Sequence, residues 1–224
     1  MNSALSELKY SLIERLKREI PAERAHQKIM QSRLPVKDIE EKVKQARKAG
    51  VLLLLYPKEL KLHTVFILRA EYEGVHSNQV SLPGGAMEVE DDSLLTTALR
   101  EANEELAIQT EKVEVLGSLS SIYVPPSNFV IQPYIGIQST EGLFIPDPYE
   151  VKSIIECPVE CLIGEEKVIE REIVVRKQQR MRVKGFQLGE NLLWGATAMI
   201  VKEFAEIMAE LKVPNVLAQN KRNK

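Results

Sequence analysis

The sequence predicts an α/β fold in which a mixed β-sheet is covered by helices on both sides. Three observations support this fold class. Apolar runs of strand length recur between residues 51 and 186, segments of helical periodicity precede, interrupt and follow them, and no change in composition divides the 224 residues into two domains. A chain of this length can bury one large core. Strands bracketed by helices in this order indicate a layered architecture.

Residues 1–49 are expected to form a helical segment that packs on the core. A helix is predicted over residues 3–20, ending before Pro21, because the leucines share one helical face: Leu5, Leu8, Leu12 and Leu16. That face could pack on the core, lie in a dimer interface or contact a membrane. Its polar side carries charges of both signs, whereas lipid-binding helices have a basic excess, so core packing is the prediction. A second helix is expected over residues 39–49, ended by Gly50.

Apolar runs predict the strands of the sheet. Two buried strands are expected at residues 51–56 and 64–68, separated by a loop that contains Pro57. Further strands follow the central helix, and a hairpin comes after them: residues 113–116, 121–124, 129–137, 168–175 and 181–186. An amphipathic helix is predicted over residues 195–211, and the polar, basic tail at 219–224 is expected to fray.

One helix carries the densest group of acidic residues. Its apolar positions recur at helical spacing: Leu95, Ala98, Leu99, Ala102 and Leu106. Glu101, Glu104 and Glu105 lie beside this stripe on neighbouring turns, where their charges would repel and raise the carboxylate pKa values. A hard divalent cation removes both costs. Oxygen ligands suit Mg²⁺ or Mn²⁺, and Mg²⁺ commonly adds water and phosphate oxygens, so the implied substrate carries phosphate.

A solvated acidic helix face is the alternative interpretation of the same residues. The surrounding sequence favours the metal site. Asp92 or Ser93 can cap the start of the helix, and the turn at Pro83-Gly84-Gly85 lets the backbone approach an ion closely. Arg100 lies between the acids and can orient one of them through a bidentate pair.

This segment resembles the Nudix box, the signature of a family of hydrolases that act on nucleoside diphosphates linked to another group. The family pattern is Gly, five residues, Glu, seven residues, then Arg-Glu-apolar-any-Glu-Glu-any-Gly-apolar. Gly85 matches the first Gly, and residues 100–105 (REANEE) match the central block. Asp92 replaces the first Glu after a gap one residue longer, and Ala107 replaces the second Gly. The resemblance implies an α/β/α sandwich, with a Nudix domain over residues 50–218.

The longer gap and the Asp are similar to a subgroup, the coenzyme A diphosphatases. Arg69-Ala70 and Pro83-Gly84-Gly85 are in register with that subgroup's upstream signature, and the segments 117–136 and 193–198 resemble it as well. Other positions depart from it: Val65-Phe66-Ile67, Gly74, Asn78 and Leu82. The likeness implies that coenzyme A or acyl-coenzyme A is cleaved to 3',5'-ADP and a 4'-phosphopantetheine product. The alternatives are an ADP-ribose or dinucleotide diphosphatase and a non-catalytic, nucleotide-binding Nudix sensor.

The family resemblance implies a role for each acidic residue. Glu101 and Glu105 would be the principal metal ligands, and Glu104 a further ligand or the base. The carbonyl of Gly84 or Gly85 would be another ligand. Arg100 would hold the acids in register, whereas Asp92 would stabilise the junction between loop and helix.

Residues outside the acidic block are expected to complete the site. The candidate substrate-binding residues are Arg69, His76, Ser77, Asn78 and Gly85. For Arg69 a surface ion pair is the alternative. Glu150 is a candidate auxiliary acid, with a solvated loop position as its alternative.

Composition limits the remaining function classes. A net charge of −2 argues against a nucleic-acid binder with a broad basic surface. Cys157 and Cys161 fit neither the common zinc spacings nor a CxxC redox motif, so both are predicted to be reduced core thiols. The longest apolar run is too short for a bilayer, and no signal peptide is evident. We therefore expect a cytoplasmic enzyme with a small-molecule substrate and no membrane partner. The sequence does not decide whether the chain forms a homodimer.

Overall fold

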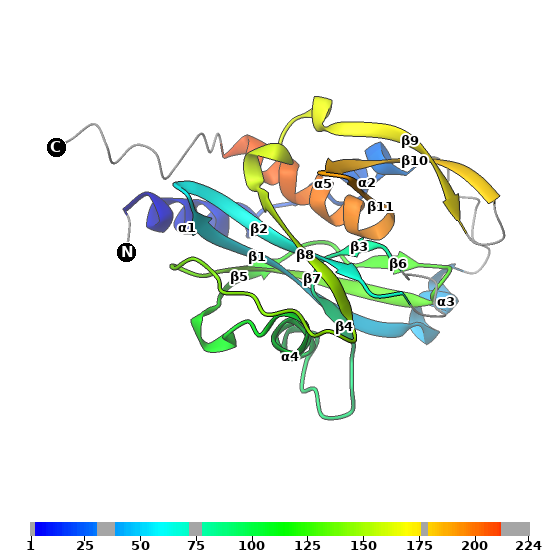
Figure 1. Ribbon diagram of the computed structural model, residues 1–224, viewed down its shortest axis with the longest axis horizontal. Coiled ribbons are helices and arrows are strands. Elements are labelled where there is room, and N and C mark those ends of the chain that lie inside the picture. The colour runs from blue at the N-terminus through cyan, green and yellow to red at the C-terminus, as the bar shows by residue number, and fades with distance from the viewer. Residues whose placement is uncertain (1–2, 31–38, 72–77, 176–178, 212–224) are drawn as a thin grey trace.

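A single mixed sheet lies between two helical layers (Figure 1). The computed structural model describes residues 3–30, 39–71, 78–175 and 179–211. Helix α4 (Leu94–Leu106) covers one face of the sheet. The opposite face is covered by α1 (Ser3–Leu16), α2 (Ala22–Ile29) and α5 (Gly195–Glu210). The predicted α/β sandwich with an added helical segment at the N-terminus is confirmed.

The main sheet has eight strands among the described residues, in the order β3-β2-β1-β7-β5, with β4, β6 and β8 pairing to β1, β7 and β2. Strands β1 (Arg47–Lys58) and β7 (Phe129–Ile137) run parallel, whereas the other pairs are antiparallel. The remaining bounds are β2 (Lys61–Arg69), β3 (Val80–Ser81), β4 (Gly84–Ala86), β5 (Glu114–Ser118), β6 (Ile122–Val124) and β8 (Val151–Pro158). The sheet is therefore mixed, as predicted.

Strand β1 is buried on both faces because helices cover it from two sides. Leu52, Leu54 and Tyr56 pack in one apolar cluster with the buried side of α4. Val51, Leu53 and Leu55, which point the other way, pack in a second cluster with α1 and α5. A strand buried on both faces reads as a continuous apolar run, which explains the uninterrupted sequence 51–56.

A small second sheet completes the fold beside α5. It contains β9 (Val168–Val175), β10 (Gln179–Leu188) and β11 (Asn191–Trp194), paired antiparallel. The predicted hairpin is confirmed, whereas β11 was not anticipated. Short 3₁₀ turns occur at Thr110–Lys112, Val159–Cys161 and Glu165–Lys167.

Several predictions about the first half of the chain are wrong in detail. The helix expected over residues 39–49 is α3 (Ile39–Gln45), because residues 47–49 pair with β7 and β4 and this pairing overrides local preference. Pro57 lies within β1, opposite Leu62, and the chain turns at Glu59 and Leu60 with positive φ. Helix α2 was not foreseen.

The N-terminal helices pack on the core through buried residues. The α1 leucines at positions 5, 8 and 12 belong to the same apolar cluster as α5. On α2, His26 Nε2 lies 3.0 Å from Glu203 Oε2 of α5, and Glu203 is fully buried. The division into a segment 1–49 and a Nudix domain 50–218 remains a prediction, and its boundary falls inside β1.

The two cysteines have different surroundings. Both are free, but Cys157 is buried and Cys161 is exposed, so the prediction of two core thiols is wrong for Cys161. None of the helices in the described part of the chain is long and apolar enough to span a bilayer.

Candidate metal centre

Helix α4 meets β1 and β4 because glycines permit close backbone approach. A β-carbon at position 50 would lie 2.1 Å from the carbonyl oxygen of Leu94, so only glycine lets α4 rest directly on β1. Gly84 and Gly85 lie in β4, paired with β1, and not in the predicted turn. Gly84 has φ +146°, and a β-carbon at Gly85 would meet the Glu101 carboxylate at 2.4 Å. The Glu101 carboxylate thereby lies directly on β4.

Asp91 and Ser93 hold the start of α4. The Ser93 side chain accepts a hydrogen bond from the Thr96 amide at 3.1 Å and caps the helix. Asp91 is buried and accepts hydrogen bonds from two Arg100 nitrogens, at 3.1 and 2.9 Å, from Thr97 Oγ1 at 2.9 Å and from the Glu88 amide at 3.0 Å. The prediction that Asp92 stabilises this junction is wrong. Asp92 is exposed, and Asp91 takes that role.

The Arg100 guanidinium beside Asp91 holds the pKa of that carboxyl well below its usual range. Replacing Asp91 by Asn should destabilise the fold by about 2 kcal/mol at neutral pH, the cost of lost hydrogen bonds to a charged partner. A lowered folded-state pKa gives stability that is present above the unfolded-state value of about 4 and is lost as the pH falls below it. The difference between the two proteins should therefore be constant from pH 7 to about pH 5 and shrink below about pH 4. Urea unfolding at each pH measures it, and an equal difference at pH 3 and pH 7 would contradict the assignment.

Glu105 is a buried carboxylate, and one of its two oxygens accepts no hydrogen bond from the described residues. Its side chain is 1% exposed, and its Oε2 accepts a hydrogen bond from the Gly84 amide at 2.8 Å. Arg69 Nη2 lies 3.2 Å from Oε1, yet Oε1 makes no hydrogen bond with the described residues. Burial raises the pKa of Glu105 to about 7, although the Arg69 charge and the Gly84 amide act to lower it. A buried oxygen without a hydrogen-bond donor is suited to a cation.

Three carboxylates converge at this point. Glu101, Glu105 and Glu150 each offer one oxygen, and these oxygens lie within 4.8 Å of one another. Glu101 is partly buried, which raises its pKa despite the neighbouring Arg100. Mg²⁺ and Mn²⁺ prefer oxygen ligands, and three carboxylate oxygens surround this partly buried position. The residues present therefore fit a hard divalent cation.

Glu150 reaches the group from the loop between β7 and β8. Asp147 fixes this loop, because its Oδ1 accepts hydrogen bonds from the amides of Tyr149 and Glu150 at 2.8 and 3.1 Å. The backbone of the loop is also tied to α4 and β2, through Asp147 N to Glu105 O and Ala70 N to Glu150 O, each at 2.9 Å. Glu150 is exposed, but it is not an isolated loop residue.

Glu104 is not one of the three converging carboxylates. Its side chain is 54% exposed and accepts a hydrogen bond from Arg100 Nη1 at 2.8 Å, and the same nitrogen donates to Glu101 Oε1 at 3.1 Å. Arg100 therefore contacts two of the acids, and its role in holding them in register stays a prediction. A role for Glu104 as ligand or base remains a prediction.

The predicted substrate-binding residues have different environments. Arg69 Nη2 donates to the Gly84 carbonyl at 2.8 Å and lies 3.2 Å from Oε1 of the buried Glu105, so it is an ion-pair partner within the candidate site, and its contact with substrate stays a prediction. The Gly84 carbonyl, a candidate metal ligand, is thus already an acceptor for Arg69. Asn78 is exposed, and its Oδ1 accepts from Lys152 Nζ at 3.1 Å. His76 and Ser77 lie outside the described residues.

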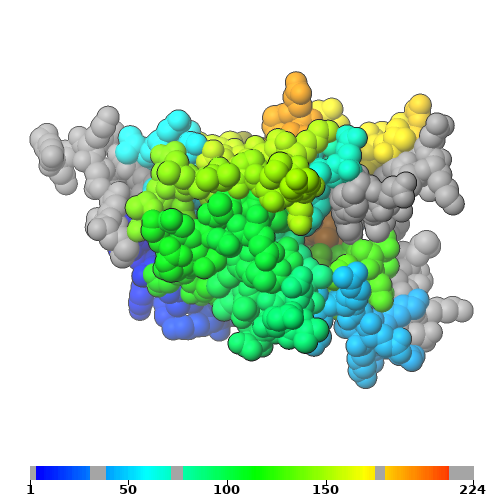
Figure 2. Space-filling view, turned by 60° about the horizontal axis from the view of Figure 1, so that its bottom comes forward, coloured from blue at the N-terminus to red at the C-terminus, as the bar shows by residue number. Residues whose placement is uncertain are grey.

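Fold and site together define a layered α/β protein with a carboxylate centre suited to a divalent cation beside α4, which lies on the face that Figure 2 shows. Residues 46–175 match the family model of the NUDIX domain. A Pectobacterium atrosepticum protein described as "Uncharacterized Nudix hydrolase NudL" is 36% identical over 169 residues, which cover 73% of this chain and 83% of that protein. Its Photorhabdus laumondii namesake is 33% identical over 131 residues, 58% of this chain and 69% of that protein.

Among solved structures, the Nudix hydrolase RenU from M. smegmatis superposes with a TM-score of 0.53 at 13% identity, covering 75% of this chain and 89% of that one. That likeness supports the fold. The family model and the sequence relatives go further: the chain belongs to the Nudix family and is a Nudix hydrolase, an enzyme of the class that acts on nucleoside diphosphate derivatives with the help of divalent metal ions.

Proposed function

We propose that the enzyme hydrolyses the diphosphate bridge of coenzyme A or acyl-coenzyme A to 3',5'-ADP and a 4'-phosphopantetheine product. The observation that carries the diphosphatase chemistry is the convergence of Glu101, Glu105 and Glu150 beside Gly84 and Gly85 of β4. These carboxylates would hold the cation, together with the backbone carbonyl oxygen of Gly84 or Gly85. When bound, a divalent cation there neutralises charge on the phosphates and lowers the pKa of a bound water.

The remaining residues of the site would orient these groups. Arg100 keeps Glu101 and Glu104 in position, and Arg69 fixes both the Gly84 carbonyl and Glu105. The oxygen of a water forms a bond to one phosphorus, and the P–O bond of the bridge breaks. The electron pair stays on the bridging oxygen of the departing phosphate, and the water proton goes to a carboxylate base, for which Glu104 and Glu105 are the candidates. His76, Ser77, Asn78 and Gly85 are proposed substrate contacts.

Support for coenzyme A comes from the long gap in the box, from Arg69-Ala70 and from the segment 193–198. An ADP-ribose or dinucleotide diphosphatase and a nucleotide-binding sensor are the competing functions. A complete set of converging acids argues against a sensor, because binding alone does not require it.

We expect a higher kcat/KM for coenzyme A than for ADP-ribose or NADH. A panel of coenzyme A, acetyl-coenzyme A, ADP-ribose, NADH and diadenosine polyphosphates, each with Mg²⁺ and with Mn²⁺, tests this after chromatographic separation of the products. A tenfold preference for ADP-ribose would overturn the coenzyme A assignment and leave the diphosphatase chemistry standing. If none of the substrates in the panel is hydrolysed, the nucleotide-binding sensor becomes the better account of the function.

A further inference from the structure

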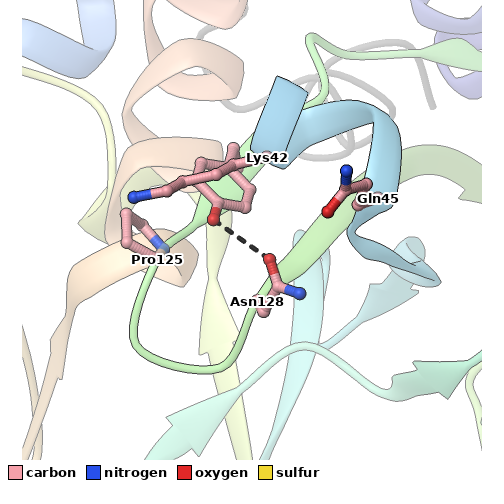
Figure 3. Close-up of a pocket in the computed structure, with 5 residues that line it drawn as sticks. Lys42, Gln45, Pro125 and Asn128 are labelled. Atoms are coloured by element: carbon pink, nitrogen blue, oxygen red, sulfur yellow. Dashed lines mark hydrogen bonds between the residues drawn. The ribbon is translucent and has the colours of Figure 1, made fainter. Parts of the chain in front are cut away.

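A polar pocket lies between α3 and the turn that joins β6 to β7 (Figure 3). Its volume is about 330 Å³, and it is lined by Lys42, Gln45, Tyr123, Pro125 and Asn128. We call these five residues the distal pocket. Its size falls at the lower end of small-molecule sites, which is enough for one part of a larger ligand.

The lining of the distal pocket combines one cation, one aromatic ring and two amides. Tyr123 donates a hydrogen bond from its hydroxyl to Asn128 Oδ1 at 3.0 Å, which leaves the Asn128 Nδ2 group as a donor (Figure 3). Lys42 extends from α3 across the pocket toward Pro125. None of the five lining residues is acidic, although Gln45 Nε2 donates to Glu41 Oε1 at 3.3 Å, and no ion pair joins Lys42 to another described residue. This set is suited to a planar base that carries an anionic group, because the ring can stack and the cation can pair with phosphate.

Strand β1 connects the distal pocket to the metal centre. Gly50 pairs with Gly85, beneath Glu101, and Arg47 pairs with Phe129. The Arg47 amide also donates to the carbonyl of Asn128 at 3.0 Å. Arg47 and Gly50 are three positions apart, a distance of about 10 Å along β1. In Figure 2, α3 (blue) lies on the same face as α4. A nucleoside attached to a diphosphate at the metal centre can span this distance.

A second cation stands on the α4 side of this end of β1. Lys48 is exposed and, because side chains alternate along a strand, lies on the same face as Gly50. Arg47 lies on the opposite face, where its guanidinium is 4.4 Å from the centroid of the Phe129 ring. This end of β1 therefore adds a positive charge on the face of the metal centre, whereas the metal centre is acidic. An additional phosphate on the nucleoside would be attracted to this end.

We propose that the distal pocket binds the phosphorylated nucleoside end of the substrate, with the base against Tyr123 and the phosphate monoester near Lys42. The proposal rests on the proposed function, since it places the diphosphate at the metal centre. Coenzyme A carries a 3'-phosphate on its adenosine, whereas ADP-ribose and NADH do not. The distal pocket would therefore be the determinant that selects coenzyme A.

The test compares coenzyme A with 3'-dephospho-coenzyme A, which differ only in that phosphate. Lys42→Gln should raise KM for coenzyme A at least about tenfold with little change in kcat, and should change KM for the dephospho substrate less than about twofold. Tyr123→Leu should raise KM for both substrates, because both contain the base. Arg182→Gln, which removes an exposed cation from β10, and Tyr10→Leu, which removes an exposed ring from α1, are the matched controls and should change neither.

A binding measurement separates this proposal from the proposed function. Isothermal titration calorimetry measures the binding of 3',5'-ADP to wild type and to Lys42→Gln without any turnover. The matched ligand is 5'-AMP, which lacks the 3'-phosphate. Wild type should bind 3',5'-ADP more tightly, and Lys42→Gln should abolish the difference. If coenzyme A is not hydrolysed but this difference is found, the proposed function fails and the distal pocket stands. Equal affinity of wild type for the two nucleotides, or a difference that survives in Lys42→Gln, overturns the pocket.

Discussion

Glu105→Gln and Glu101→Gln should each lower kcat by at least about a hundredfold while the fold is kept, because neutralisation of the phosphate charge depends on these ligands. Glu105 is the more sensitive position. It is buried, its Oε2 accepts from Gly84, and its Oε1, which lies 3.2 Å from Arg69 Nη2 and accepts no hydrogen bond from a described residue, would be the oxygen that binds the cation. Both variants are isosteric, so circular dichroism should match wild type. The measurement is kcat on the best diphosphate of the panel at saturating Mg²⁺ or Mn²⁺.

The matched control for these variants is Glu172→Gln, which removes an exposed carboxylate of β9 that pairs with Arg180. It should leave kcat within about twofold of wild type, as expected for an exposed ion pair of small energetic weight. If Glu101→Gln and Glu105→Gln behave like this control, the two residues are not metal ligands.

Gly50→Ala should have the largest effect on stability. The added β-carbon would lie 2.1 Å from the carbonyl oxygen of Leu94 and 3.0 Å from the amide nitrogen of Ala98, both backbone atoms of α4. The helix would have to move off β1, at a cost of about 3 kcal/mol, the upper end for an overpacked core. For a domain of this size the melting temperature should fall by roughly 6–12 °C. Displacement of Glu101 and Glu105 should lower kcat as well.

Gly189→Ala is the control for the general effect of replacing glycine. Position 189 has φ +58°, but a β-carbon there would meet nothing within 4 Å. Its cost should be limited to backbone strain of about 1 kcal/mol, with kcat unchanged. Equal losses of stability in the two variants would mean that α4 and β1 are not in the close contact described.

Local pattern was sufficient to predict the parts of the fold that depend on periodicity. The apolar run 51–56 predicted a buried strand, and the apolar stripe of α4 predicted that Glu101 and Glu105 lie beside it on neighbouring turns. The N-terminal end of β1 could not be predicted in this way. Residues 47–49 are strand because β7 and β4 pair with them, and this depends on contacts far apart in the sequence.

In the candidate site, too, local spacing predicts some features, whereas others depend on contacts between residues far apart in the sequence. Spacing along one helix predicts that Glu101 and Glu105 are neighbours. Glu150 could be named only as a candidate acid, because its approach to them requires the loop after β7 to be fixed by Asp147 and by the pairing of β8 with β2. Asp91 was missed because counting back from Arg100 selected Asp92. Whether Asp91 or Asp92 contacts Arg100 depends on the direction in which each side chain leaves the turn. The spacing of residues in the sequence does not give that direction. The distal pocket joins α3 to a distant turn and has no sequence signal.

Titration of Mn²⁺ into the protein, with free Mn²⁺ followed by electron paramagnetic resonance, tests the central claim most directly because it needs no substrate. We predict saturable binding to wild type, weakened at least about tenfold in each of Glu101→Gln, Glu105→Gln and Glu150→Gln, because affinity depends on the number of charged oxygen ligands. Glu172→Gln should bind as wild type does. Mn²⁺ affinity that is the same in wild type and in all three variants would contradict a metal centre formed by these carboxylates.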